Sequence, residues 1–190
     1  MHLGIYDHFG WAVAVVASPD RDVVERRRLE LVEPGVTAAP IHYERDHHDD
    51  HSNAALVATV RASVVRASAA AFDALASSTT GSIIGPIRSC SLRSWPSDFP
   101  TDIATLRRPP YESRADAIMY RQVLADLARR RGWDVYQFDA KHVVEQAATI
   151  LGARADDVLD GPRRRLGPPW TRDHRIALAA TVVAGAHLTP

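Results

Sequence analysis

The sequence predicts an α/β protein with a mixed five-stranded sheet and helices packed on both faces of that sheet. Three short apolar segments follow one another near the N-terminus with only tight turns between them. Two further strand-like segments then alternate with long helical patterns. The 190 residues, 46% of them hydrophobic, suit one domain spanning residues 1–190.

The first three strands form a predicted antiparallel meander, because two short turns join them. In the third strand, Leu29 and Leu31 would face the core while charged residues alternate outward. The middle strand is apolar throughout, which is typical of a strand buried on both faces. The three strands are expected over residues 3–7, 11–17 and 23–33.

Helices and strands alternate in the rest of the chain. From Val57 to Leu75, small apolar residues recur at three- and four-residue steps, which predicts a long amphipathic helix. A fourth strand is expected over residues 82–88, with Pro86 bending it or placing it at an edge. Further helices are expected over residues 113–131, 139–151 and from 171 onward, with a fifth strand at 133–138. Helical crossovers require the fourth and fifth strands to be parallel neighbours.

Local patterns complete this prediction. Ser113 and Asp116 have the spacing of a capping box, which would start the helix there. Residues 34–53 and 91–112 are expected to be long loops, and long loops in a compact domain are usually functional or mobile. Residues 153–169 would be loop or contain one short helix.

Charge and cysteine content exclude some classes of protein. Lysine and arginine number 23, aspartate and glutamate also number 23, and the net charge is zero. Binding of nucleic acid over a broad positively charged surface is therefore not expected, although a local basic patch is allowed. The single cysteine, Cys90, excludes a disulfide scaffold and is expected to be a small buried residue.

The apolar runs are shorter than a spanning helix and no secretory signal is visible, so we expect a cytoplasmic protein without a membrane partner.

The element order resembles that of the ribonuclease H-like fold, and in particular its Holliday-junction-resolvase branch. The resemblance also rests on Ile5-Tyr-Asp7 and on the segment from Asp173 to Ala180. It implies a divergent member of a bacterial subgroup that is a metal-dependent nuclease. In such proteins, acids from the first strand, the fourth strand and the last helix bind two divalent cations, Mg²⁺ or Mn²⁺, at a phosphodiester.

By that resemblance, Asp7 matches the first-strand acid, and Asp173 or His174 matches the ligand of the last helix. Asp7 and Asp173 would hold the metal, and His174 would assist proton transfer or metal binding. The expected fourth strand carries no acid, and Glu112 in the following loop could replace it. The missing acid leaves a second interpretation open, a catalytically inactive ribonuclease H-like protein that binds or serves as a scaffold. Purely structural roles are also open. Asp7 could accept hydrogen bonds from backbone N–H groups of the turn that follows it, and Asp173 could be stabilised by the dipole at the start of its helix.

Two other groups of residues are candidate binding sites. Arg163, Arg164 and Arg165 lie in a predicted loop and could contact the phosphates of a nucleic acid. The segment from His42 to His51 is rich in histidine and aspartate, and could bind a transition metal or be a solvated polar loop. The substrate and the oligomeric state are left open by the sequence.

Overall fold

A computed structural model describes residues 1–44, 49–79 and 85–188 of the chain. It contains one five-stranded sheet in the order β3-β2-β1-β4-β5. β2 pairs antiparallel with both β1 and β3, whereas β1, β4 and β5 are parallel. This confirms the α/β class and the mixed sheet. The strands are β1 (His2–Asp7), β2 (Trp11–Ala17), β3 (Val23–Glu30), β4 (Ser89–Arg93) and β5 (Asp134–Phe138).

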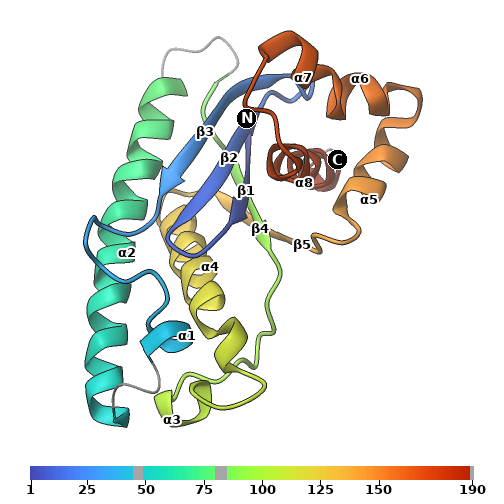
Figure 1. Cartoon of the computed structure of the whole chain (residues 1–190). Helices are drawn as coiled ribbons and strands as arrows, with labels where there is room; N and C mark the ends of the chain where they lie inside the picture. The colour runs from blue at the N-terminus through green and yellow to red at the C-terminus, as the bar shows by residue number, and fades with distance from the viewer. Residues whose placement is uncertain (45–48, 80–84, 189–190) are drawn as a thin grey trace.

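Helices cover both faces of the sheet. Figure 1 shows α2 and α4 on one side of the strands and α5 and α8 on the other. The short helices α1 and α3 lie beyond one end of the sheet, near the start of α4 (Figure 1). The helices are α1 (Pro40–Glu44), α2 (Asp50–Thr79), α3 (Ile103–Leu106), α4 (Glu112–Arg130), α5 (Val143–Leu151), α6 (Ala155–Leu159), α7 (Gly161–Leu166) and α8 (Arg172–Leu188), with a 3-10 turn, η1, at Gly152–Arg154.

The alternation of β2 side chains divides the core into two clusters. Ala12, Ala14 and Val16 pack into the cluster that α2 and α4 cover. Val13 and Val15 pack into the cluster that α5 and α8 cover. The uninterrupted apolar run of β2 is therefore buried on both faces, as predicted.

Gly4 in β1 determines how closely α8 approaches the sheet. A Cβ atom at Gly4 would lie 1.9 Å from the backbone oxygen of Ala177, so only glycine fits there. α8 consequently crosses directly over β1 and β2. Its first turn then reaches the end of β1, where Asp173 contacts His8.

α2 packs along α4 and contacts β3. The predicted apolar stripe is confirmed at Val60, Val64 and Leu75, and Phe72 is also fully buried. In the part of the chain that the structure describes, α2 is the one helix long and apolar enough to cross a membrane by length and composition, which the apolar-run analysis did not anticipate.

The prediction of the fourth strand over residues 82–88 was wrong for residues 85–88, which are not in a strand. β4 runs from Ser89 to Arg93, and residues 80–84 lie outside the described part of the chain. Pro86 lacks the N–H that a ladder needs, and its carbonyl accepts a hydrogen bond from the N-terminal amine instead. Cys90 is therefore inside β4 and not at its end, and it is fully buried as expected.

The two predicted long loops and the capping box also need correction. The 34–53 segment contains α1 and the start of α2, and the 91–112 segment contains α3. η1, α6 and α7 occupy most of residues 153–169. α4 begins at Glu112, one residue before Ser113, and has no side-chain cap. The Asp116 carboxylate instead accepts hydrogen bonds from the N–H groups of Ile41 and His42. Asp116 thus caps α1 from another helix.

Candidate functional site

A cavity of about 360 Å³ opens at the edge of the sheet where β1 and β4 end. Its walls come from the end of β1, the β1–β2 turn, the end of β4 and the first turns of α4. We call it the arginine pocket. It is lined by Tyr6, Asp7, His8, Phe9, Arg93, Ser113, Arg114, Ala117 and Arg121.

The carboxylate of Asp7 is fully buried between two guanidinium groups. Arg93, the last residue of β4, donates from Nε to Oδ1 at 2.8 Å and from Nη2 to Oδ2 at 2.7 Å. Arg121 on α4 donates from Nε to Oδ1 and Oδ2 at 3.2 and 3.0 Å. The same Nη2 of Arg93 also donates to the Asp7 carbonyl at 2.7 Å. Both carboxylate oxygens therefore accept hydrogen bonds from arginine side chains.

The two arginines are affected differently by their surroundings. Burial opposes the charge of Arg93, but the hydrogen bonds and charge of Asp7, together with a smaller contribution from Tyr6, outweigh it and hold the pKa above its ordinary value. For Arg121, burial and the nearby charges of Arg93 and Arg114 lower the pKa, although Asp7 partly compensates. Arginine remains protonated in either case. The pKa of Arg121 is thus lowered mainly by burial, and secondarily by the neighbouring positive charges.

The charges that line the arginine pocket do not balance. Arg93, Arg114 and Arg121 bring three positive charges against the single negative charge of Asp7, which leaves an excess of two. The exposed guanidinium of Arg114 lies 5.8 Å from the centre of the Phe99 ring, a cation–π contact, and it donates no hydrogen bond to any described residue. A concave surface with this charge attracts anions.

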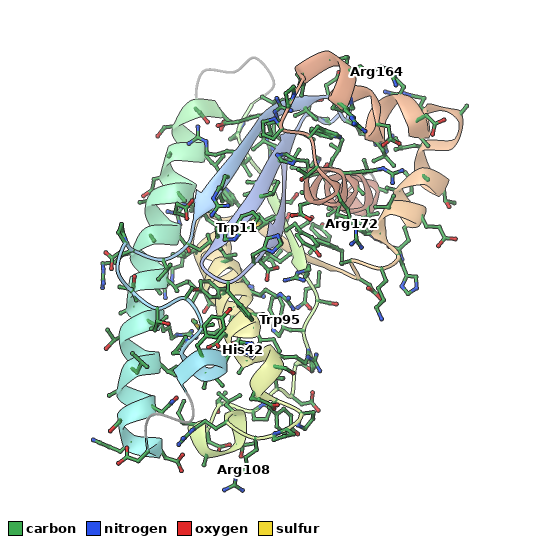
Figure 2. The ribbon with its side chains drawn as sticks, viewed as in Figure 1. Trp11, His42, Trp95, Arg108, Arg164 and Arg172 are labelled. Atoms are coloured by element: carbon green, nitrogen blue, oxygen red, sulfur yellow. The ribbon has the colours of Figure 1, made fainter. Side chains whose placement is uncertain are left out.

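The rim of the pocket continues from His8 to the start of α8. His8 Nε2 lies 2.9 Å from Oδ2 of Asp173. The His8 ring stacks on Trp11 at 4.0 Å, and the Arg28 guanidinium covers Trp11, also at 4.0 Å. Figure 2 labels Trp11 at the strands and Arg172 at the start of α8.

His174 stabilises the start of α8. Its Nδ1 accepts a hydrogen bond from the backbone N–H of Thr171 at 3.2 Å and lies 2.8 Å from the Thr171 hydroxyl. A side chain in the first turn that accepts from the residue before the helix is the arrangement of a capping box. Burial, and then the charge of Arg26, lower the pKa of His174. The neutral ring therefore serves as a hydrogen-bond acceptor in the cap.

An aromatic group borders the arginine pocket on the side of α1. Phe9, which lines the pocket, has its ring centre 5.7 Å from that of His42 and 6.4 Å from that of Tyr43. The Tyr43 side chain is 59% exposed. The carboxylate of Asp116 fixes α1 by accepting from the His42 N–H at 2.8 Å. Figure 2 shows His42 between the end of the sheet and the lower part of α4. Phe9, His42 and Tyr43 are the aromatic group below.

Asp173 lies near the end of β1, where its carboxylate contacts His8, the residue after Asp7. Asp7 pairs with Arg93 and Arg121, whereas Asp173 pairs with His8. Glu112 is the first residue of α4 and does not line the arginine pocket. Within residues 1–44, 49–79 and 85–188, no three histidine, cysteine or acidic side chains gather as a metal-binding group.

The donor set at this edge does not fit Mg²⁺ or Mn²⁺. These ions need several carboxylate oxygens, and an ion at Asp7 would have to displace two guanidinium groups. At the end of β4, where the resemblance calls for an acid, the chain has Arg93.

The other predicted binding residues lie elsewhere. The segment 163–165 is part of α7 and not a loop, and Arg165 pairs with Asp157. Arg163 and Arg164 are exposed, and Figure 2 shows Arg164 far from His42 in that view. Of the predicted histidine cluster, His47 and His48 lie outside the described residues, while His42 belongs to the aromatic group and His51 is exposed in α2.

Sequence reasoning missed Arg93, Arg114 and Arg121. Placing the fourth strand at residues 82–88 left Arg93 in a loop, so its position at the end of a strand next to Asp7 was not seen. Arg121 lies four residues after Ala117 and three before the buried Leu124, and this helical spacing was an available signal that it lies towards the inner face of α4.

The comparisons with known proteins give no further guide to this site. The chain matches no known protein family and no curated protein sequence. The geometry of the arginine pocket is therefore the observation on which a function can be based.

Proposed function

We propose that the chain is a divergent ribonuclease H-like protein that binds nucleic acid through its phosphates and does not cleave it. The element order supports the first part, since three antiparallel strands are followed by parallel strands and helices. Asp7 at the end of β1 and Asp173 at the start of α8 also occupy one edge of the sheet, as in the resemblance.

The pairing of Asp7 with Arg93 and Arg121 is the observation that carries the proposal. In a two-metal nuclease the first-strand acid must offer its oxygens to cations. Here both oxygens accept from guanidinium groups, which are held in place by those bonds. Arginine is suited to phosphate oxygens because it presents several N–H donors in one plane. Asp7 therefore serves to position two arginines for an anionic ligand.

The zero net charge of the chain is compatible with this local function. Phosphate contacts need a local positive field, and the excess of two charges in the arginine pocket supplies it. The exposed Arg163 and Arg164 on α7 would be additional contacts for the backbone of a longer nucleic acid.

Binding of a fluorescently labelled single-stranded 20-mer in EDTA, followed by anisotropy, tests the proposal. We expect saturable binding that weakens about ten-fold in Arg114→Ala, because a contact between an ionised donor and a phosphate is lost. Arg130→Ala is the matched control, since Arg130 is exposed on the same helix but about 24 Å away at 1.5 Å per residue. Its binding should equal that of the wild type.

Parallel samples prepared with Mn²⁺ in place of EDTA distinguish the alternatives. We expect the oligonucleotide to remain intact. Cleavage that requires Mn²⁺ and disappears in Asp7→Asn would support the nuclease interpretation instead. Equal binding by the wild type and Arg114→Ala would show that the arginine pocket is not the binding site, and absent binding would leave a scaffold role.

A further inference from the structure

We propose that the arginine pocket binds the terminal phosphomonoester of a nucleotide, with the aromatic group stacking on the adjoining nucleoside. This inference rests on the proposed function and names the part of the nucleic acid that enters the pocket. An internal phosphodiester, which is the group at the cleavage site of a nuclease, would not be the preferred ligand.

The first argument is the match of charge. The pocket has an excess of two positive charges over its single carboxylate. A phosphomonoester carries about −1.5 to −2 at pH 7, whereas a phosphodiester in a strand carries about −1. Only the phosphomonoester neutralises the excess, and it would also relieve the repulsion among Arg93, Arg114 and Arg121.

The second argument is the supply of donors. Arg121 uses Nε for Asp7 and Nη1 for the carbonyl of Ser94, and Nη2 makes no hydrogen bond with a described residue. The Arg114 guanidinium lies at the same wall, in the first turns of α4. The Ser113 hydroxyl lies there too, and makes a long hydrogen bond of 3.5 Å to the Pro110 carbonyl that a phosphate oxygen could replace. These groups can donate to the three oxygens of a terminal phosphate.

The third argument is size. A volume of about 360 Å³ is near the lower limit of small-molecule sites, which hold roughly 300–1,000 Å³. This space suits the end of a strand or one nucleotide and not a continuous strand or a duplex.

The fourth argument is the exposed aromatic surface next to the pocket. Phe9 contributes to the wall and contacts both His42 and Tyr43, and Tyr43 is largely exposed. Unpaired bases stack on such side chains. Asp116 holds α1 in position, so it acts as a positioning residue for Tyr43.

Competition against the labelled 20-mer in EDTA tests the inference. The competitors are one unlabelled 10-mer with a 5′-phosphate, a 3′-phosphate or hydroxyls at both ends, a free 5′-mononucleotide, and inorganic phosphate. We expect one of the phosphorylated 10-mers to compete about ten-fold better than the hydroxyl form. Arg114→Ala should abolish that difference, and Arg130→Ala should preserve it.

Tyr43→Ala tests the stacking contact separately. This substitution should weaken competition by the phosphorylated 10-mer and the mononucleotide several-fold, and leave competition by inorganic phosphate unchanged. Tyr43→Phe keeps the ring and should behave as the wild type.

Each outcome decides one point. If the 10-mers bind equally with and without a terminal phosphate, the inference is wrong and the proposed function stands. Direct calorimetric titration of the 5′-mononucleotide covers the case in which no oligonucleotide binds. If the mononucleotide then binds in the wild type but not in Arg114→Ala, the inference holds for a free nucleotide and the proposed function is wrong. If neither ligand binds, both are wrong.

Discussion

The carboxylate of Asp7 at the end of β1 forms a two-point ion pair with the guanidinium of Arg93 at the end of β4, at 2.8 and 2.7 Å. Arg121 from α4 pairs with the same carboxylate. This relationship links two parallel strands and a helix at one point. Asp7, which matches the metal-binding acid in the resemblance, here holds the two arginines of the arginine pocket in place.

Asp7→Asn is expected to lower the free energy of unfolding by about 3 kcal/mol, because two partly buried arginines lose their counter-charge. Urea denaturation measures this, with Asp20→Asn, in an exposed turn, as the control that should leave stability unchanged. A carboxylate held for a metal would be repelled by neighbouring acids, and its removal would stabilise the metal-free protein. A stability increase in Asp7→Asn would thus contradict the pairing.

Gly4→Ala is expected to lower the free energy of unfolding by about 3 kcal/mol or more, because the added Cβ overlaps the backbone at Ala177. The backbone of α8 cannot move away without opening the core. Gly185→Ala is the control within α8, since among the described residues its Cβ would meet the His2 ring, at 3.5 Å. It should be neutral or stabilise by up to about 1 kcal/mol through helix propensity. Equal stability of the two variants would contradict the close approach of α8 to β1.

Asp116 should make the folded protein less stable as the pH rises from 4 to 6. Burial raises the pKa of Asp116 from 3.8 to about 6, against the hydrogen bonds from His42 and Ile41. The folded state therefore retains a proton between pH 4 and 6 that the unfolded state releases. The contribution of this group is greatest below pH 4 and falls as the pH rises to 6.

Asp116→Asn cannot ionise and supplies the comparison. The unfolding free energy of the wild type minus that of the variant should fall by up to about 3 kcal/mol between pH 4 and 7. Urea titrations at several pH values measure it. A difference that grows with pH would show that the carboxylate is favoured in its charged form.

Asn53 at the start of α2 is fully buried, and neither polar atom of its side chain has a hydrogen-bond partner among the described residues. An unpaired buried amide costs about 1–3 kcal/mol. Asn53→Leu should therefore raise the thermal midpoint by several degrees, read by circular dichroism. Ser52→Ala, at an exposed neighbouring position, should cause little change. A lower midpoint in Asn53→Leu would show that the amide has a polar partner.

Periodicity predicted the sheet and its helices because burial is a pattern that the sequence displays directly. The buried run of β2 and the alternating Leu29 and Leu31 were recognised in this way. The fourth strand was misplaced because Ile83, Ile84 and Ile87 gave a stronger apolar pattern than Ser89-Cys-Ser-Leu-Arg93. β4 lies inside the sheet between β1 and β5, and the small residues there are buried by neighbours that lie far away in the chain.

The candidate site was predictable only in part. The meeting of the β1 end with the start of α8 follows from the element order, and it is found at His8 and Asp173. The arginines were not predictable, because their roles depend on which strand end and which helix face lie beside Asp7. Asp116 likewise had the spacing of a local cap but binds α1 instead.

Paired calorimetric titrations of the wild-type protein test the central claim, that Asp7 and its arginines form a site for anions and not for cations. One titration uses a 5′-mononucleotide in EDTA and the other uses Mn²⁺ alone. We predict saturable heat with the nucleotide, reduced in Arg114→Ala, and no saturable heat with Mn²⁺ at millimolar concentration. Saturable Mn²⁺ binding that is lost in Asp7→Asn, together with no heat from the nucleotide, would contradict the account.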